Sequence, residues 1–322
     1  MSVLAYTESE NGSFKKSAFE VASYASKLAE SLGTEAVAVA LNVDNPGELG
    51  AYGIQKVLQI TEDRLKNFNA RATASLLKQA VSESGARVVI ISSSTDAKFA
   101  ASLLAGMLKG GFVNNVVSLP ESTSPMVVKR TAFSNKGFAF TELKGEPAMI
   151  GVSNNAFGTI EKNVTAEILP YEPRFAESDF GVKSISVDKV TDKVTIADAD
   201  IVVSGGRGLK GPENWGMIEE LAEVLGAATA CSKPVSDLGW RPHSEHVGQT
   251  GKPVASNLYI AIGISGAIQH LAGVNASKTK VVINTDPEAP FFKAADYGVV
   301  GDAFEVVPEL IEKLKEFKAG NG

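Results

Sequence analysis

The 322-residue sequence predicts an α/β protein with two domains. Its length exceeds what one hydrophobic core usually supports, because single cores stop growing at about 250–300 residues. Apolar runs of strand length alternate with segments of helical periodicity in the first third of the chain, which is typical of a parallel sheet covered by helices. The alternation starts again near Ile201. We therefore expect an α/β domain over residues 1–188 and a Rossmann-like domain over residues 189–322.

The N-terminal domain opens with strands and helices in strict alternation. The expected elements are, in order, strand Val3–Tyr6, helix Phe14–Leu32, strand Ala36–Val43, helix Ala70–Ser84, strand Val88–Ile91 and helix Ala97–Leu108. Apolar residues such as Ala18 and Val21 recur at helical spacing in the first helix before Gly33 ends it. The last helix stops at Gly110-Gly111. Because these strands are apolar throughout, we expect them to be buried in a parallel sheet.

The rhythm changes after about residue 125. Three short strand-like runs follow, Met126–Thr131, Gly137–Leu143 and Ala148–Val152, with a turn signal between the first two. We expect all three to be antiparallel strands added to the sheet. The stretch Tyr171–Val190 holds a proline, many charges and one weak apolar alternation, which predicts a connector with an edge strand. We place the domain boundary near Asp188.

The C-terminal domain restarts the α/β pattern. Its expected elements are strand Ile201–Val203, helix Glu213–Leu225, strand Ala227–Ala230, strand Leu258–Ile262, a helix whose first turns contain His270, strand Lys280–Ile283 and a last helix Val307–Phe317. Parallel sheets bind ligands at the carboxyl ends of their strands, so the loops that follow these strands are the expected location of function.

Composition and charge argue against several classes of function. The net charge of -6 and the pI near 5.3 disfavour a nucleic-acid partner, because phosphate binding needs clustered Lys and Arg. Cys231 is the one cysteine and is expected to be a small buried residue, while His243 and His246 have too few neighbouring ligands for a metal. The N-terminus is acidic and no apolar stretch approaches the ~20 residues of a membrane span. We expect a cytoplasmic protein without metal or membrane insertion.

The first loop of interest reads Gly206-x-Gly208-x-x-Gly211 and matches the dinucleotide-binding fingerprint. Glycines let backbone N–H groups approach a pyrophosphate, the helix N-terminus adds partial positive charge, and Arg207 would add a full one. Pro212 and the lack of an acidic residue after the next strand argue against a nicotinamide cofactor. An ordinary tight turn explains the glycines equally well.

Three further loops carry polar groups after strands. Val247–Lys252 places an amide and a hydroxyl between two glycines, which suits a heteroaromatic ring, although a hydrophilic turn has the same composition. Gly263–Ala267 leads a buried strand into a helix through small residues, and its first-turn N–H groups would receive negative charge. His270 in that helix is either a site residue or a satisfied structural histidine. Asn284 stands at the end of another strand.

Together these loops resemble the large (alpha) subunit of electron-transfer flavoproteins. The matching segments are Ser204–Lys210, Val247–Lys252, Leu258–Gly273, Asn284–Pro290 and Ala295–Gly298. They follow one another in the right order across the C-terminal domain. The N-terminal residues agree in architecture but carry no comparably specific motif.

The resemblance implies an electron carrier rather than an enzyme with its own substrate. It implies one FAD in the C-terminal domain, a heterodimer with a smaller beta subunit that the N-terminal domain contacts, and electron transfer from acyl-CoA and related dehydrogenases to a quinone-linked oxidoreductase. The implied FAD contacts are Arg207, Ser232, Lys233, Val247, Gly248, Gln249, Thr250, Ser265, Gly266, Ala267, Ile268, Gln269, His270, Asn284, Asp302 and Ala303. In the family pattern, Thr250 would hydrogen-bond the flavin N5 and His270 would lie near its N1 and C2 carbonyl.

One residue departs from the family pattern. Lys233 stands where many members carry an arginine, so it keeps the positive charge but loses the planar fork, and we expect an altered redox potential. Two other functions stay open on the residues alone. An NAD(P)-dependent dehydrogenase would use the Gly206-x-Gly208-x-x-Gly211 loop and turn over a small substrate, and a non-redox interaction module would bind a nucleotide without flavin.

Overall fold

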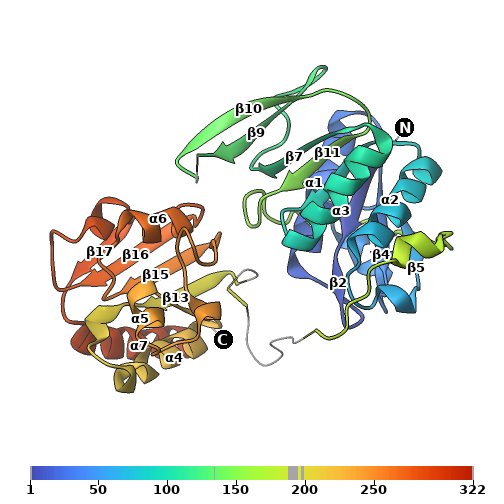
Figure 1. Ribbon diagram of the computed structural model, residues 1–322. Helices are drawn as coiled ribbons and strands as arrows, with labels where there is room; N and C mark the ends of the chain where they lie inside the picture. The colour runs from blue at the N-terminus through green and yellow to red at the C-terminus, as the bar shows by residue number, and fades with distance from the viewer. Residues whose placement is uncertain (1, 134, 188–194, 197–198, 321–322) are drawn as a thin grey trace. The chain divides into compact units, whose positions relative to one another are not determined.

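The computed structural model describes residues 2–133, 135–187, 195–196 and 199–320 (Figure 1). The chain divides into two compact units, Met1–Ala132 with Phe138–Lys189 and Phe133–Gly137 with Val190–Gly322, called here the N-terminal and the C-terminal unit. The expected boundary at Asp188 lies outside the described residues. Each unit has its own sheet, and both sheets are dominated by parallel pairs, which confirms the predicted α/β class.

The N-terminal unit contains a sheet in the order β10-β9-β7-β11-β6-β1-β4-β5-β12, with β8 paired to β9. Its strands are β1 (Ser2–Thr7), β4 (Glu35–Leu41), β5 (Lys56–Ile60), β6 (Ala86–Ser92), β7 (Gly111–Val116), β8 (Ser122–Thr123), β9 (Met126–Ala132), β10 (Gly137–Leu143), β11 (Ala148–Val152) and β12 (Glu167–Pro170). The helices are α1 (Lys16–Ser31), α2 (Ala70–Ser84) and α3 (Thr95–Leu108), and a small hairpin joins β2 (Ser9–Glu10) to β3 (Ser13–Phe14).

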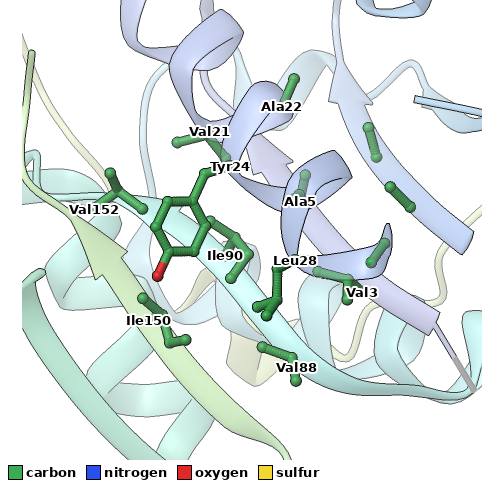
Figure 2. Packing of buried hydrophobic residues seen from close by; sticks show 14 of the residues in the cluster. Val3, Ala5, Val21, Ala22, Tyr24, Leu28, Val88, Ile90, Ile150 and Val152 are labelled. Atoms are coloured by element: carbon green, nitrogen blue, oxygen red, sulfur yellow. The ribbon is translucent and has the colours of Figure 1, made fainter. Parts of the chain in front are cut away.

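Two hydrophobic cores lie on opposite faces of this sheet. Helix α1 covers one face, and Figure 2 shows Val21, Tyr24 and Leu28 of α1 packed with Val3 and Ile90 of the sheet. Helices α2 and α3 cover the other face. Burial on both faces explains why β1, β4 and β6 read as unbroken apolar runs.

Local sequence sets the ends of the helices. The Asn69 side chain accepts a hydrogen bond from the Ala72 N–H at the start of α2, and Ser94 accepts one from Ala97 at the start of α3. Helix α2 ends at Gly85, whose φ of 61° lies in the left-handed region. These caps place both helices within two residues of their predicted bounds.

Two expectations for this unit were wrong. Strand β11 is parallel to β6 and β7, not antiparallel, because its five consecutive buried residues belong to the centre of the sheet. Strand β9 fulfils the antiparallel prediction by its pairing with β7 and β8, and β10 lies beside β9 in the same sheet. The described residues 171–187 of the connector contain the 3₁₀ turn Glu177–Phe180 and no strand, whereas β12 lies just before them.

The C-terminal unit has a fully parallel sheet in the order β14-β13-β15-β16-β17. The strands are β13 (Ile201–Gly205), β14 (Ala228–Cys231), β15 (Leu258–Ile262), β16 (Thr279–Asn284) and β17 (Tyr297–Val300), and the helices are α4 (Gly216–Leu225), α5 (Lys233–Asp237), α6 (Ile268–Val274) and α7 (Ala303–Gly320). Helices α4 and α7 pack on one face and α6 on the other (Figure 1).

The strand order of the C-terminal unit reverses at β13. The chain moves from β13 outward to β14 and then returns to place β15 on the other side of β13. Such a reversal leaves a crevice at the carboxyl ends of the two neighbouring strands, where α/β sheets bind ligands. Among the described residues, no helix combines the length and apolar character that a membrane crossing demands.

Candidate cofactor site

A cavity of about 740 Å³ occupies this crevice, within the range of ~300–1,000 Å³ typical of ligand pockets. The segments that follow β13, β14, β15 and β16 all reach its wall. The predicted site residues that line it are Arg207, Ser232, Lys233, Val247, Gly248, Gln249, Thr250, Ser265, Ala267, Gln269, His270 and Asn284. The structure thus brings together residues that lie up to 77 positions apart, from Arg207 to Asn284.

Four predicted residues do not reach the wall of this cavity. Asp302 accepts a hydrogen bond from the Phe304 N–H at the start of α7 and lies 3.7 Å from the Lys210 ammonium. Ala303 follows it in the same turn and is buried. Gly266 instead permits a close approach of chain segments, because a Cβ there would lie 2.5 Å from the Phe291 nitrogen. Ile268 is exposed at the start of α6.

The glycine fingerprint serves packing between loops. The Gly206 N–H donates to the Ile262 carbonyl at 2.8 Å, and the Gly208 N–H donates to the Gly263 carbonyl at 3.0 Å. A Cβ on Gly208 would lie 2.7 Å from the Gly263 Cα. These two N–H groups are therefore already used within the protein, which favours the tight-turn interpretation of Gly206 and Gly208 over contact with a pyrophosphate. The nicotinamide alternative loses its structural basis with them, since it depended on this loop.

Arg207 supplies the cationic group of this loop. Its exposed guanidinium lines the cavity, and none of the described residues forms an ion pair with it. An unpaired guanidinium presents a planar fork of N–H donors that matches a phosphate. Arg207 is accordingly the group in this wall best suited to an anionic ligand.

The Val247–Lys252 loop is fixed at its backbone and open at its side chains. Its Val247 N–H donates to the Cys231 carbonyl at 3.0 Å and its Gln249 N–H donates to the Gln269 carbonyl at 2.7 Å. The side chains of Gln249 and Thr250 are exposed on the cavity wall and form no hydrogen bond to the described residues. An anchored backbone with free polar side chains is suited to orient a ligand.

Asn284 joins two segments of the wall. Its side-chain amide donates to the Ile264 carbonyl at 3.1 Å, and its carbonyl oxygen accepts from the Asp286 N–H at 3.0 Å. Both polar atoms of the side chain are therefore engaged with the protein. Its first role is to hold the carboxyl end of β16 against the loop after β15.

Lys233 is paired within the chain. Its ammonium lies 2.9 Å from the Asp237 carboxylate one helical turn later, and both side chains are more than half exposed. Both residues line the cavity. The positive charge expected at this position is thus partly compensated by a carboxylate that the sequence reasoning did not consider. The spacing of four residues along a helix is the signal that could have revealed the pair.

Two buried histidines stand in the wall. His270 is 7% exposed and His246 is 2% exposed, and neither Nδ1 atom has a hydrogen bond among the described residues. Burial, then the charge of His246, lowers the pKa of His270 to about 4, against a smaller opposing effect of the Val247 backbone. Burial is also the main reason that the pKa of His246 is lowered, followed by His243 and Lys233. Buried polar atoms without partners are the groups that a bound molecule satisfies.

His246 lines the cavity, although the sequence reasoning did not include it among the cofactor contacts. The neighbouring His243 ring lies 5.2 Å away and is exposed. Within the described ranges, no group of three His, Cys, Asp or Glu residues could hold a metal ion. Cys231 is fully buried, as expected, and burial raises the pKa of its thiol to about 12.

A second cavity, of about 940 Å³, lies in the N-terminal unit at the ends of β1 and β4. Its charged residues are Glu8, Glu10, Asp44, Asp63 and Asp96 against Lys15 and Lys66. This excess of carboxylates repels a pyrophosphate at close range. The C-terminal cavity balances Arg207 and Lys233 against Asp237 and Asp286, so it is the better of the two for a dinucleotide.

Comparisons with known proteins agree for both halves of the chain. A family model described as "Electron transfer flavoprotein domain" matches residues 3–173, and one described as "Electron transfer flavoprotein FAD-binding domain" matches residues 195–275. The electron transfer flavoprotein subunit alpha of Syntrophomonas wolfei is 35% identical over 320 residues, 97% of this chain and 98% of that protein. The Bacillus subtilis and Paracoccus denitrificans subunits of the same name are 36% and 38% identical, with 84% and 81% of this chain and 83% of each relative covered.

Proposed function

Because this chain belongs to the electron transfer flavoprotein alpha-subunit family, we propose that it carries electrons on one FAD held in the C-terminal cavity, as part of a heterodimer with a beta subunit. The chain carries an FAD-binding domain, and it is an electron carrier by family. The observation that supports the location is that the matched residues 195–275 contain most of the cavity wall.

The residues of the wall divide the work of holding FAD. Bound FAD supplies a ring that accepts and releases electrons. Arg207 attracts the pyrophosphate, because its guanidinium has no carboxylate partner among the described residues. By the family resemblance, Thr250 would offer its free hydroxyl to the flavin N5, and His270 would offer its imidazole to the N1 and C2 carbonyl region. Lys233 adds positive charge whose strength depends on Asp237.

The donor and the acceptor follow from the resemblance of the loops. We propose that electrons arrive from acyl-CoA and related dehydrogenases and leave to a quinone-linked oxidoreductase. In this scheme the N-terminal unit contacts the beta subunit, and the chain itself transforms no small substrate. Support comes from the matching segments of the C-terminal unit, which share their order with the family.

Purification of the chain together with its beta subunit tests this proposal. We expect a yellow heterodimer that releases one FAD on denaturation, and a colourless product or one that releases a nicotinamide or another nucleotide would contradict it. Arg207→Gln should weaken FAD binding about tenfold or more, because a charge-assisted hydrogen bond contributes about 1.5–3 kcal/mol. The matched control is Arg174→Gln, an exposed arginine in the N-terminal unit, which should bind FAD normally.

The electron donor is tested separately. The flavin should bleach when an acyl-CoA dehydrogenase and its substrate are added under anaerobic conditions, and the colour should return with a quinone-linked oxidoreductase. A flavin that stays oxidised with a panel of such dehydrogenases would contradict the proposed donor while leaving the FAD assignment intact.

A further inference from the structure

Three aromatic rings lie together beneath the cofactor cavity. Tyr259 on β15 stacks parallel to Phe291 with ring centroids 6.3 Å apart, and His270 on α6 lies 6.0 Å from Phe291. The Tyr259 hydroxyl lies 2.9 Å from the His270 Nε2. Tyr259 and Phe291 are fully buried, so only His270 connects this group to the cavity.

Among the described residues, the Tyr259 hydroxyl is within hydrogen-bonding distance of the His270 Nε2. Burial raises the pKa of Tyr259 far above its usual value, so the phenol keeps its proton at any physiological pH. The Ser204 hydroxyl lies beside the phenol and acts on it as a donor, because it opposes the rise in the pKa of Tyr259. A buried hydroxyl that donates to nothing is costly, so the phenol donates to the His270 Nε2.

The position of the proton on His270 follows from this bond. The imidazole is neutral near pH 7, because burial lowers its pKa to about 4. A neutral imidazole carries one proton, and a ring nitrogen that accepts a hydrogen bond cannot hold it. The proton therefore resides on Nδ1, the buried atom without a hydrogen bond among the described residues.

We propose that Tyr259 is a positioning residue for the cofactor site, which fixes His270 in the tautomer with its proton on Nδ1 and so makes the imidazole a hydrogen-bond donor to the flavin. A neutral donor stabilises negative charge that develops on the ring without placing a second charge in the buried wall. The identity of the acceptor rests on the proposed function, whereas the tautomer rests on the contacts of Tyr259 alone. Removal of the hydroxyl leaves Nε2 free to carry the proton.

The test compares Tyr259→Phe with Tyr24→Phe in the heterodimer. Tyr24 is a matched control, because it is also fully buried and its hydroxyl donates to a backbone carbonyl, that of Ser118, at 2.9 Å in the other unit. This chain has three histidines, so ¹⁵N labelling of its histidines before assembly with an unlabelled beta subunit leaves few signals among which His270 is identified. We expect a protonated Nδ1 in the unaltered protein and in Tyr24→Phe, and a shift of the proton toward Nε2 in Tyr259→Phe.

The flavin potential gives a readout that a purely structural role would not move. Tyr259→Phe should lower the potential of at least one one-electron couple, which corresponds to a two- to tenfold change in the ratio of oxidised to reduced flavin, whereas Tyr24→Phe should leave both couples unchanged. In a His270→Gln background, Tyr259→Phe should have no further effect, because the tyrosine acts through the histidine.

Three results would overturn the inference. They are a proton on Nε2 in the unaltered protein, unchanged couples in Tyr259→Phe, or an equal shift with and without His270. A complex that contains no flavin would instead refute the proposed function, and the ¹⁵N spectrum of that same complex would still decide the tautomer. The spectrum of the unaltered protein needs no variant, so a folding defect in Tyr259→Phe does not prevent the test.

Discussion

His270 should make the stability of the C-terminal unit depend on pH. Its pKa of about 4 in the folded chain lies below the ordinary value of 6.5, so the unfolded chain binds more protons between these two values. The folded state is therefore fully stabilised above pH 6.5 and loses stability as the pH falls toward 4. A shift of this size corresponds to about 3 kcal/mol in total, of which about 2 kcal/mol is lost between pH 7 and pH 5.

The two tryptophans, Trp215 and Trp240, both lie in the C-terminal unit and so report its unfolding selectively. Urea unfolding of the cofactor-free protein, followed by tryptophan fluorescence at pH 7 and pH 5, measures the loss. His270→Gln should lose about 2 kcal/mol less than the unaltered chain over this interval, because glutamine does not titrate. His243→Gln is the control, since His243 is exposed, and it should follow the unaltered chain. Parallel losses in the unaltered chain and His270→Gln would refute the reasoning.

Three further predictions concern the wall of the cavity. Gly263→Ala should destabilise the C-terminal unit by several kcal/mol and abolish FAD binding, because the φ of Gly263 is 63° and a Cβ would lie 2.9 Å from the Gly208 backbone. Gly226→Ala is the control in thermal unfolding: Gly226 has a φ of 66° but open space around it, so this substitution should cost only about 1–2 kcal/mol. Asp237→Asn should raise the flavin potential in spectroelectrochemical titration, because it frees the charge of Lys233, and an unchanged potential would place Lys233 away from the ring. Asn284→Ala should weaken FAD binding roughly tenfold in fluorescence titration, because two hydrogen bonds that shape the wall are lost, and an unchanged affinity would contradict that role.

The sequence predicted those strands whose apolar residues are buried in the sheet. Strand β15 lies at its expected bounds, because its last four residues are buried and all five residues are apolar. Strand β11 has an equally clear pattern, yet its direction depends on which strands it lies beside, and that is a property of the whole sheet. Strand β17 was missed although Tyr297, Val299 and Val300 are apolar, because it is a four-residue strand at the edge of the sheet and its residues are exposed.

For the candidate site, the sequence predicted which loops line the cavity better than it predicted the role of each residue. Loop composition and family resemblance indicated the residues after each strand, and the sheet brings most of them to one cavity. The role of the glycines stayed open between a cofactor loop and a tight turn, because a sequence does not show which carbonyl groups a backbone N–H faces. His246 was not predicted as a cofactor contact, because its sequence context does not show that its ring is buried in the wall of the cavity.

The interlocking of the glycine loops bears on the rate of electron transfer. Gly206 and Gly208 are hydrogen-bonded to the backbone at Ile262 and Gly263, and Asn284 joins the next strand to the same segment. A wall built in this way cannot shift one loop without the others, so its dipoles keep their orientation when the charge inside the cavity changes. Fixed dipoles keep the reorganisation energy of a redox step small. The contact between two loops thus favours fast exchange of electrons as well as a defined shape.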